Sequence, residues 1–246
     1  MTTIPELKSN IITNPVSLTV QNENLMGAIY SNSVPADAPN FVFLHGAGLS
    51  TKEKILTMAK PAIESGIDIL AFDFSGHGES TGELKKSSLS KRVNEANEMV
   101  KQFASKKPIT LCGGSMGGFI AIKMLELCEV DKLILLCPAL YDAKAYHTPF
   151  DEGFTEIIRV PMSWHNTDVL NILENFTGKL LVIIGEQDEV IPKDVIDLLI
   201  QHTPKVKQRE IYKIPNCPHQ ITGWLAANES ELERTQNKIV DFLYGQ

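Results

Sequence analysis

The chain has 246 residues, a formal net charge of −7 and a hydrophobic content of 43%. The length suits one α/β domain over residues 1–246, and the hydrophobic content is close to that of an ordinary globular protein. The acidic balance argues against nucleic acid or an anionic membrane as the main partner. The sequence contains no run of about 18 apolar residues, so we expect no membrane-spanning helix. Residues 1–10 lack the basic and apolar regions of a signal peptide.

The four cysteines are Cys112, Cys128, Cys137 and Cys217, and no two of them have the spacing of a zinc site. We therefore expect free thiols in a reducing, cytoplasmic compartment, with a disulfide as the less favoured alternative. Neither a metal nor another cofactor is expected.

Apolar, β-prone runs predict an N-terminal hairpin and then strands that alternate with helices. The expected strands cover residues 16–20, 25–30, 41–44, 67–72, 108–112, 133–137, 179–184 and 206–212. The expected helices cover about residues 50–65, 88–105, 116–129, 192–202 and 223–243, the first capped by Ser50 or Thr51. This alternation predicts a mostly parallel sheet of about eight strands with helices on both faces.

One long segment, residues 139–178, interrupts the alternation. It carries prolines, aromatic residues and mixed charges, and it is longer than an ordinary connection between a strand and a helix. We expect a small inserted cap of short helices that follows the sixth strand.

The most informative stretch surrounds Ser115, which has Gly113 two positions before it and Gly117 two positions after it. This G-x-S-x-G pattern joins a buried strand to a helix and is typical of a nucleophile elbow. Glycine is needed beside the serine because strand and helix approach too closely for a Cβ atom. By itself the pattern also fits a phosphate-binding turn at a helix N-terminus.

Three other strand ends carry chemistry-bearing residues. His45 to Gly48 follow one strand, Asp188 follows another, and His219 lies just beyond the last strand. In parallel sheets, the carboxyl ends of the strands meet at the site of the chemistry. Serine, acid and histidine occur here in the chain order of α/β-hydrolases, which differs from the orders of trypsin-like and subtilisin-like enzymes.

On these motifs the chain resembles the α/β-hydrolase superfamily, in particular its small serine esterases and lipases, including the serine aminopeptidase S33-like and monoacylglycerol-lipase-like branch. Nearly the whole chain takes part in the resemblance. Five motifs carry it in the expected order: residues 45–48, residues 73–80, residues 113–118, residues 185–192, and His219. The resemblance implies the α/β-hydrolase fold and a cofactor-independent hydrolase.

The chemistry assigns a role to each residue. Ser115 is the candidate nucleophile, His219 the general base that takes its proton, and Asp188 the acid that holds the imidazole. Met116 is expected to be the first residue of the helix, where its backbone N–H is unpaired, so this N–H is one candidate donor to the oxyanion. The resemblance implies that the Ala47 N–H is the second donor.

Alternatives remain for the acid and for the function. Some members of the superfamily take the acid after the preceding strand, where Asp142 stands, whereas Asp73 is expected to stabilise a turn. Of the other histidines, His45 and His77 are expected to organise loops. A small or medium carboxylic ester is the favoured substrate; thioester, amide or peptide hydrolysis, and a binding protein without turnover, are the alternatives. Nothing in the sequence specifies a partner protein or an oligomeric state.

Overall fold

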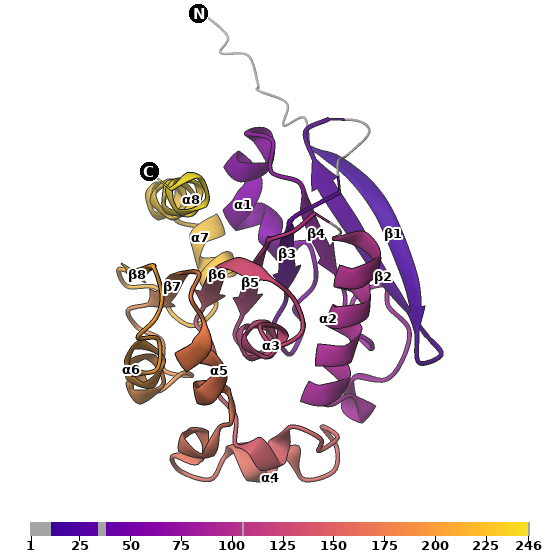
Figure 1. Cartoon of the computed structure of the whole chain (residues 1–246), viewed down its shortest axis with the longest axis vertical. Helices are drawn as coiled ribbons and strands as arrows, with labels where there is room; N and C mark the ends of the chain where they lie inside the picture. The colour runs from indigo at the N-terminus through magenta and orange to yellow at the C-terminus, as the bar shows by residue number, and fades with distance from the viewer. Residues whose placement is uncertain (1–10, 34–37, 105, 246) are drawn as a thin grey trace, which may run out of the picture.

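The computed structural model describes residues 11–33, 38–104 and 106–245, and one eight-stranded sheet runs through it (Figure 1). In space the strands follow the order β1-β2-β4-β3-β5-β6-β7-β8. Strand β2 is antiparallel to β1 and β4, and all other neighbours are parallel. The strands are β1 (Ile12–Val20), β2 (Glu23–Ser31), β3 (Phe41–Leu44), β4 (Ile69–Phe72), β5 (Ile109–Gly114), β6 (Val130–Leu136), β7 (Lys179–Gly185) and β8 (Gln208–Ile214). The expected α/β-hydrolase sheet, with its antiparallel N-terminal hairpin, is confirmed.

Helices cover both faces of the sheet. The α-helices are α1 (Lys54–Glu64), α2 (Leu89–Phe103), α3 (Met116–Met124), α4 (Phe154–Ile158), α5 (Val169–Asn175), α6 (Lys193–Gln201), α7 (Ile221–Ala226) and α8 (Glu229–Tyr244). The 3-10 helices are η1 (Leu84–Lys86), η2 (Ala143–Ala145) and η3 (Ser163–Asn166). One buried apolar cluster joins the sheet to α2, α3, α5 and α6, and a second joins it to α1, α7 and α8. Figure 1 shows α1 and α8 together on one side and α2 and α3 on the other.

Burial explains the difference between central and edge strands. Every residue of β3 and β4 is buried, as expected for strands covered by helices on both faces. Strand β1, at one edge, alternates between half-buried and exposed residues instead. The described part of the chain has no helix long and apolar enough to cross a membrane.

The segment between β6 and β7 contains η2, α4, η3 and α5. In Figure 1, α4 lies at the bottom of the view, beyond α3 and α5. Helix α5 packs against α3 and α6 and so extends the helix layer. The more distal part, with α4, stands over the carboxyl ends of the strands, where Phe154 and Ile158 line a pocket.

The prediction of one C-terminal helix over residues 223–243 is wrong, because α7 and α8 are separate helices. Asn228 breaks them with an extended φ of −134°, and its side chain bonds the Trp224 carbonyl at 2.7 Å. Asparagine favours such cap positions, and Asn228 followed by Glu231 is a readable start signal. The break lets α7 reach the site while α8 packs against α1.

The predicted start of the first helix is also wrong. Helix α1 begins at Lys54, and neither Ser50 nor Thr51 caps it; the N-cap residue is Glu53, without a side-chain hydrogen bond. The preceding residues form a turn because Lys52 is drawn inward to Asp73. Smaller shifts occur elsewhere. The turn of the N-terminal hairpin contains only Gln21–Asn22, both with positive φ. Helix α3 ends at Met124 and not near residue 129, and β8 begins and ends two residues later than predicted.

Some predictions fall outside the described residues. These are the missing signal peptide in residues 1–10, the part of the predicted loop at residues 34–37, and the end of the second helix at residue 105.

Candidate active site

Ser115 stands on a strained turn between β5 and α3. Its backbone has φ 50° and ψ −115°, a conformation that residues other than glycine rarely adopt. A Cβ atom on Gly113 would lie 2.3 Å from the Gly117 carbonyl oxygen, and one on Gly117 would lie 2.1 Å from the Leu44 oxygen. Both glycines are therefore required sterically, as the motif predicts.

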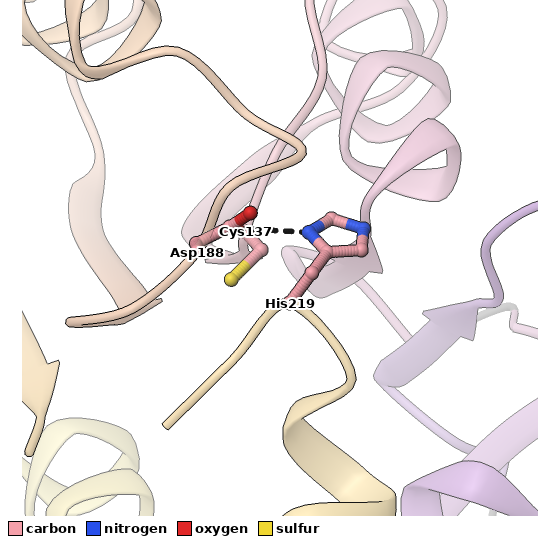
Figure 2. A group of neighbouring side chains, drawn as sticks. All are labelled: Cys137, Asp188 and His219. Atoms are coloured by element: carbon pink, nitrogen blue, oxygen red, sulfur yellow. Dashed lines mark hydrogen bonds and ion pairs between the residues drawn. The ribbon is translucent and has the colours of Figure 1, made fainter. Parts of the chain in front are cut away.

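The three predicted side chains form one hydrogen-bonded chain. Ser115 Oγ lies 3.2 Å from His219 Nε2, and His219 Nδ1 lies 2.8 Å from Asp188 Oδ2. Ser115 directly follows β5, Asp188 lies in the loop after β7 and His219 in the loop after β8. The carboxyl ends of three parallel strands therefore bring them together. Figure 2 shows the dashed contact between Asp188 and the imidazole. Such a chain can carry a proton from the hydroxyl to the imidazole.

Asp188 is held on both of its oxygens. Oδ1 accepts the backbone amides of Val190 at 2.8 Å and Ile191 at 3.0 Å, and Oδ2 faces His219. Burial alone would raise its pKa, but hydrogen bonds from His219, Cys137 and the two amides outweigh it and lower the pKa to about 2. The carboxylate is therefore ionised at neutral pH and available to a protonated imidazole.

A pocket of about 420 Å³ opens in front of Ser115. Its wall includes Ala47 and Met116, the two residues predicted to donate backbone amides. Met116 is the first residue of α3, so its N–H has no partner within the helix. A larger hollow of about 580 Å³ lies elsewhere, near Lys123, Glu129 and Asp168, and contains none of the predicted site residues.

The lining of the pocket is chemically mixed. Tyr141, Phe154 and Ile158 from the cap region are apolar, whereas Lys54, Gln220 and Thr222 contribute polar groups. A substrate with one apolar and one polar part would find partners for both.

The competing residues stand in other places. Asp142, the alternative acid, accepts hydrogen bonds from the Lys144 amide and from Asn166. Asp73 accepts from Lys52 and from the Glu79 amide, as a turn-stabilising carboxylate does.

His45 and His77 lie behind the site. His45 is fully buried; its Nε2 accepts the Phe74 amide at 3.0 Å and its Nδ1 donates to the Gly46 carbonyl at 2.8 Å. Burial and then the charge of Arg92 lower the pKa of both His45 and His77. Neither histidine contacts Ser115, so they organise the loops after β3 and β4.

Two residues of the site were not predicted. Cys137 follows β6 with a φ of 42°, and its side chain lies beside Asp188, as Figure 2 shows. Burial first and Asp188 second raise the pKa of that thiol. Arg92 of α2 is fully buried, and its guanidinium lies 3.2 Å from the sulfur of Met116.

Among the described residues, two groups of side chains could offer ligands to a metal ion. One is Cys137, Asp188 and His219; the other is Glu53, Asp73 and Glu79. Lys52 Nζ lies within 3.0 Å of all three carboxylates of the second group and so already places a cation among them. The first group contains no such cation.

Comparison with known proteins gives the family. Residues 38–167, a little over half of the chain, match the family model described as "Serine aminopeptidase, S33". The lysophosphatidylserine lipase ABHD12 of Rattus norvegicus is 23% identical over 238 residues, covering 82% of this chain and 59% of the relative. The chain thus spans about three-fifths of the length of that relative. A proline iminopeptidase of Pestalotiopsis fici is 35% identical, but only over 89 residues, which are 35% of this chain and 31% of that protein.

Solved structures agree on the fold. A structure of the Pyrococcus furiosus esterase Pf2001 matches with a TM-score of 0.70 at 20% identity, covering 99% of this chain and 95% of that one. Est1E of Butyrivibrio proteoclasticus, solved with ferulic acid, matches with a TM-score of 0.67 at 19% identity, covering 93% and 99%. Together with the family match, these likenesses show that the chain is an α/β-hydrolase and belongs to the family described as serine aminopeptidase, S33.

Proposed function

We propose that this protein hydrolyses carboxylic esters, with Ser115 as nucleophile, His219 as general base and Asp188 as the residue that orients the base. The observation that carries the proposal is the chain of contacts from Ser115 Oγ to Nε2 and from Nδ1 to Asp188, at 3.2 and 2.8 Å, beside an open pocket. A hydroxyl needs an adjacent base because its own pKa is too high for attack at neutral pH.

The reaction proceeds in two steps. His219 takes the proton of Ser115 as Oγ attacks the ester carbonyl, and then returns it to the leaving alcohol, which produces an acyl-enzyme. Water, activated by the same histidine, releases the acid. The amides of Met116 and Ala47 are assigned to the oxyanion. Losing one such donor typically costs about 3–4 kcal/mol of transition-state stabilisation.

The mixed lining of the pocket supports an ester with an apolar acyl part and a polar alcohol part. The acyl part would lie against Tyr141, Phe154 and Ile158, and the alcohol part towards Lys54 and Gln220. A volume of about 420 Å³ favours a small or medium acyl group. The relatives named lysophosphatidylserine lipases lend this substrate class further support.

A panel of p-nitrophenyl esters of increasing acyl length tests this function, with matched thioesters and p-nitroanilides beside it. We expect turnover of the esters with an optimum at short or medium chains, and loss of turnover in Ser115→Ala. Faster turnover of the thioesters or anilides would replace the ester assignment, and turnover of no substrate in the panel would favour a binding protein.

Compartment belongs to the proposal as well. All four cysteines are free thiols, which favours the reducing cytoplasm. Cell fractionation followed by blotting tests this, and recovery outside the cytoplasmic fraction would contradict it.

A further inference from the structure

Three potential zinc ligands, one of them the imidazole of His219, meet on the side of that ring that faces away from Ser115. Cys137, Asp188 and His219 each offer one atom, and these three atoms lie within 4.8 Å of one another. The residues follow β6, β7 and β8, so the parallel strands gather them from distant parts of the sequence (Figure 2). This is why cysteine spacing does not reveal the cluster.

Backbone contacts hold two of the three ligand residues, Cys137 and Asp188. The Cys137 amide donates to the Ile183 carbonyl at 2.8 Å, and the Gly185 amide donates to the Cys137 sulfur at 3.4 Å. The Val190 and Ile191 amides occupy Asp188 Oδ1, so Oδ2 is the oxygen that faces the cluster. A ligand set held by backbone contacts needs little reorganisation to bind an ion.

Thiolate, carboxylate and imidazole are the ligands that Zn²⁺ prefers. Bonds of ~2.0–2.3 Å in a tetrahedron separate neighbouring ligand atoms by ~3.3–3.7 Å. In the structure the three atoms lie within 4.8 Å of one another. To admit the metal, the 2.8 Å contact between His219 Nδ1 and Asp188 Oδ2 must open by roughly half an ångström, and any separation longer than the tetrahedral one must shorten.

The cluster is also within reach of solvent. Cys137 and His219 line the 420 Å³ pocket, and Asp188 lines a neighbouring hollow of about 390 Å³. The side chains of His219 and Asp188 remain 13% and 7% exposed. An ion can therefore approach without unfolding the loops.

We propose that Cys137 Sγ, Asp188 Oδ2 and His219 Nδ1 form an inhibitory site for one Zn²⁺ ion, with water as the fourth ligand. The inhibitory consequence rests on the function proposed above, whereas binding of the ion does not.

The inhibition follows from the tautomer of the imidazole. Zinc on Nδ1 displaces the proton from that atom, and the neutral ring carries its proton on Nε2 instead. Nε2 then faces Ser115 as a donor and cannot accept its proton, so the base is lost. The thiol releases one proton to solvent, and the thiolate and carboxylate together balance the charge of the ion.

The test begins with metal binding to the whole protein. Co²⁺, a spectroscopic substitute for Zn²⁺, is titrated into the wild type, and the near-ultraviolet charge-transfer absorption of a thiolate–Co²⁺ bond is recorded. We expect this absorption in the wild type and in Cys217→Ser, whose thiol is buried nearby but is not in the cluster. We expect it to be absent in Cys137→Ser, which keeps a hydrogen-bond donor but removes the thiolate.

The second arm measures the reactivity of Ser115. Fluorophosphonate labelling of the wild type should slow at least tenfold with saturating Zn²⁺ and recover with EDTA. Cys137→Ser should need ~100-fold more Zn²⁺ for the same effect, because removal of a ligand weakens binding at least as much as removal of its supporting contacts. Protection of Cys137 from alkylation by Zn²⁺, mapped by mass spectrometry in the wild type, gives the same answer if the variant does not fold.

Three results would overturn the site: no Co²⁺–thiolate absorption in the wild type, absorption that persists in Cys137→Ser, or absorption lost in Cys217→Ser. Bound Zn²⁺ that leaves labelling unchanged would overturn the inhibition. A wild type that is not labelled even without Zn²⁺ would instead refute the hydrolase, and the Co²⁺ titration would still decide the site.

Discussion

Two buried cations on opposite sides of the loop after β4 have opposite surroundings. Lys52 Nζ lies 2.8 Å from Asp73, 2.8 Å from Glu79 and 3.0 Å from Glu53. Arg92 forms no ion pair with any described residue. Its guanidinium lies between the rings of Phe74 and Phe150, each centred at 5.1 Å, and beside Met116 and His77.

The pKa values follow these surroundings. Burial alone would lower the pKa of Lys52, but its hydrogen bonds to the three carboxylates raise it. Burial lowers the pKa of Arg92 to about 10, which still leaves a cation at neutral pH.

We interpret this difference as one of role: the charge of Lys52 stabilises the fold, whereas the charge of Arg92 is placed to act on the reaction. Lys52 joins the loop after β3 to the loop after β4, which stabilises the fold. Arg92 is a desolvated charge in no ion pair with a described residue, although the buried Glu95 on the same helix raises its pKa, and such a group destabilises a protein. Its guanidinium contacts the side chain of Met116, whose backbone amide is assigned to the oxyanion.

Asp188→Asn should have the largest effect on turnover, because it removes the charge that faces the imidazole. We expect ester turnover to fall by ~10⁴, since the imidazole loses its orienting carboxylate. Thermal stability should also fall, because the lowered pKa of Asp188 means that its ionised form stabilises the fold at neutral pH, although a neutral amide can still accept from the Val190 and Ile191 amides. The matched control is Asp142→Asn, which should retain turnover; a loss confined to Asp142→Asn would make Asp142 the acid.

Lys52→Met should destabilise the fold by about 3–5 kcal/mol, because it leaves the fully buried Asp73 without its cation. Urea unfolding measures this. Glu79→Gln is the control: the Glu79 side chain is 71% exposed, so its removal should cost less than about 1 kcal/mol. Equal losses in the two variants would mean that the cluster is not organised around Asp73.

Arg92→Met should act in the opposite way. We expect an unfolding free energy that is unchanged or higher by about 1 kcal/mol, because a desolvated charge is replaced by an apolar chain. Turnover should fall roughly tenfold, since a charge near the oxyanion contributes on the order of 1–2 kcal/mol at an effective dielectric of about 20. Arg92→Lys, which keeps the charge, should retain more activity. Destabilisation as large as in Lys52→Met, with unchanged turnover, would make Arg92 purely structural.

The smallest effect concerns pH. His45 and His77 have pKa values below the usual 6.5, so the unfolded chain binds more protons as the pH drops below 6.5. Stability should therefore fall in that window, by on the order of 1 kcal/mol per pH unit for each histidine that stays neutral in the fold. Arg92→Met should flatten this slope, because Arg92 contributes to both shifts. An unaltered slope would show that burial alone causes them.

The strand and helix order could be predicted because local patterns carry it. Buried strands read as continuous apolar runs, and the elbow glycines have a steric reason that depends only on the turn. Ser115, Asp188 and His219 could be selected because each follows a strand, and parallel strands bring such positions to one edge. Their mutual contacts in the structure agree with that rule.

Cys137 also stands at the end of a predicted strand, residues 133–137, so the same rule places it at this edge of the sheet. A single thiol in an apolar run does not by itself indicate a site. Its position beside Asp188 depends on β6 and β7 being neighbours in the sheet and on its own positive φ, which no short-range pattern reports.

Arg92, by contrast, was within reach of the sequence. Leu89, Val93, Ala96 and Val100 mark the buried face of α2, and Arg92 falls on the same face by helical spacing. Because arginine is charged, it is not counted among the apolar residues that define a buried helix face. The Asn228 break between α7 and α8 was likewise readable from its cap residues.

Fluorophosphonate labelling of the native protein reports whether Ser115 is an activated nucleophile. We expect stoichiometric labelling at Ser115, identified by peptide mass spectrometry, and its loss in Ser115→Ala. We also expect strongly slowed labelling in His219→Ala, because the base is gone. A native protein that is not labelled, or that is labelled equally after Ser115→Ala, would show that Ser115 is not an activated nucleophile.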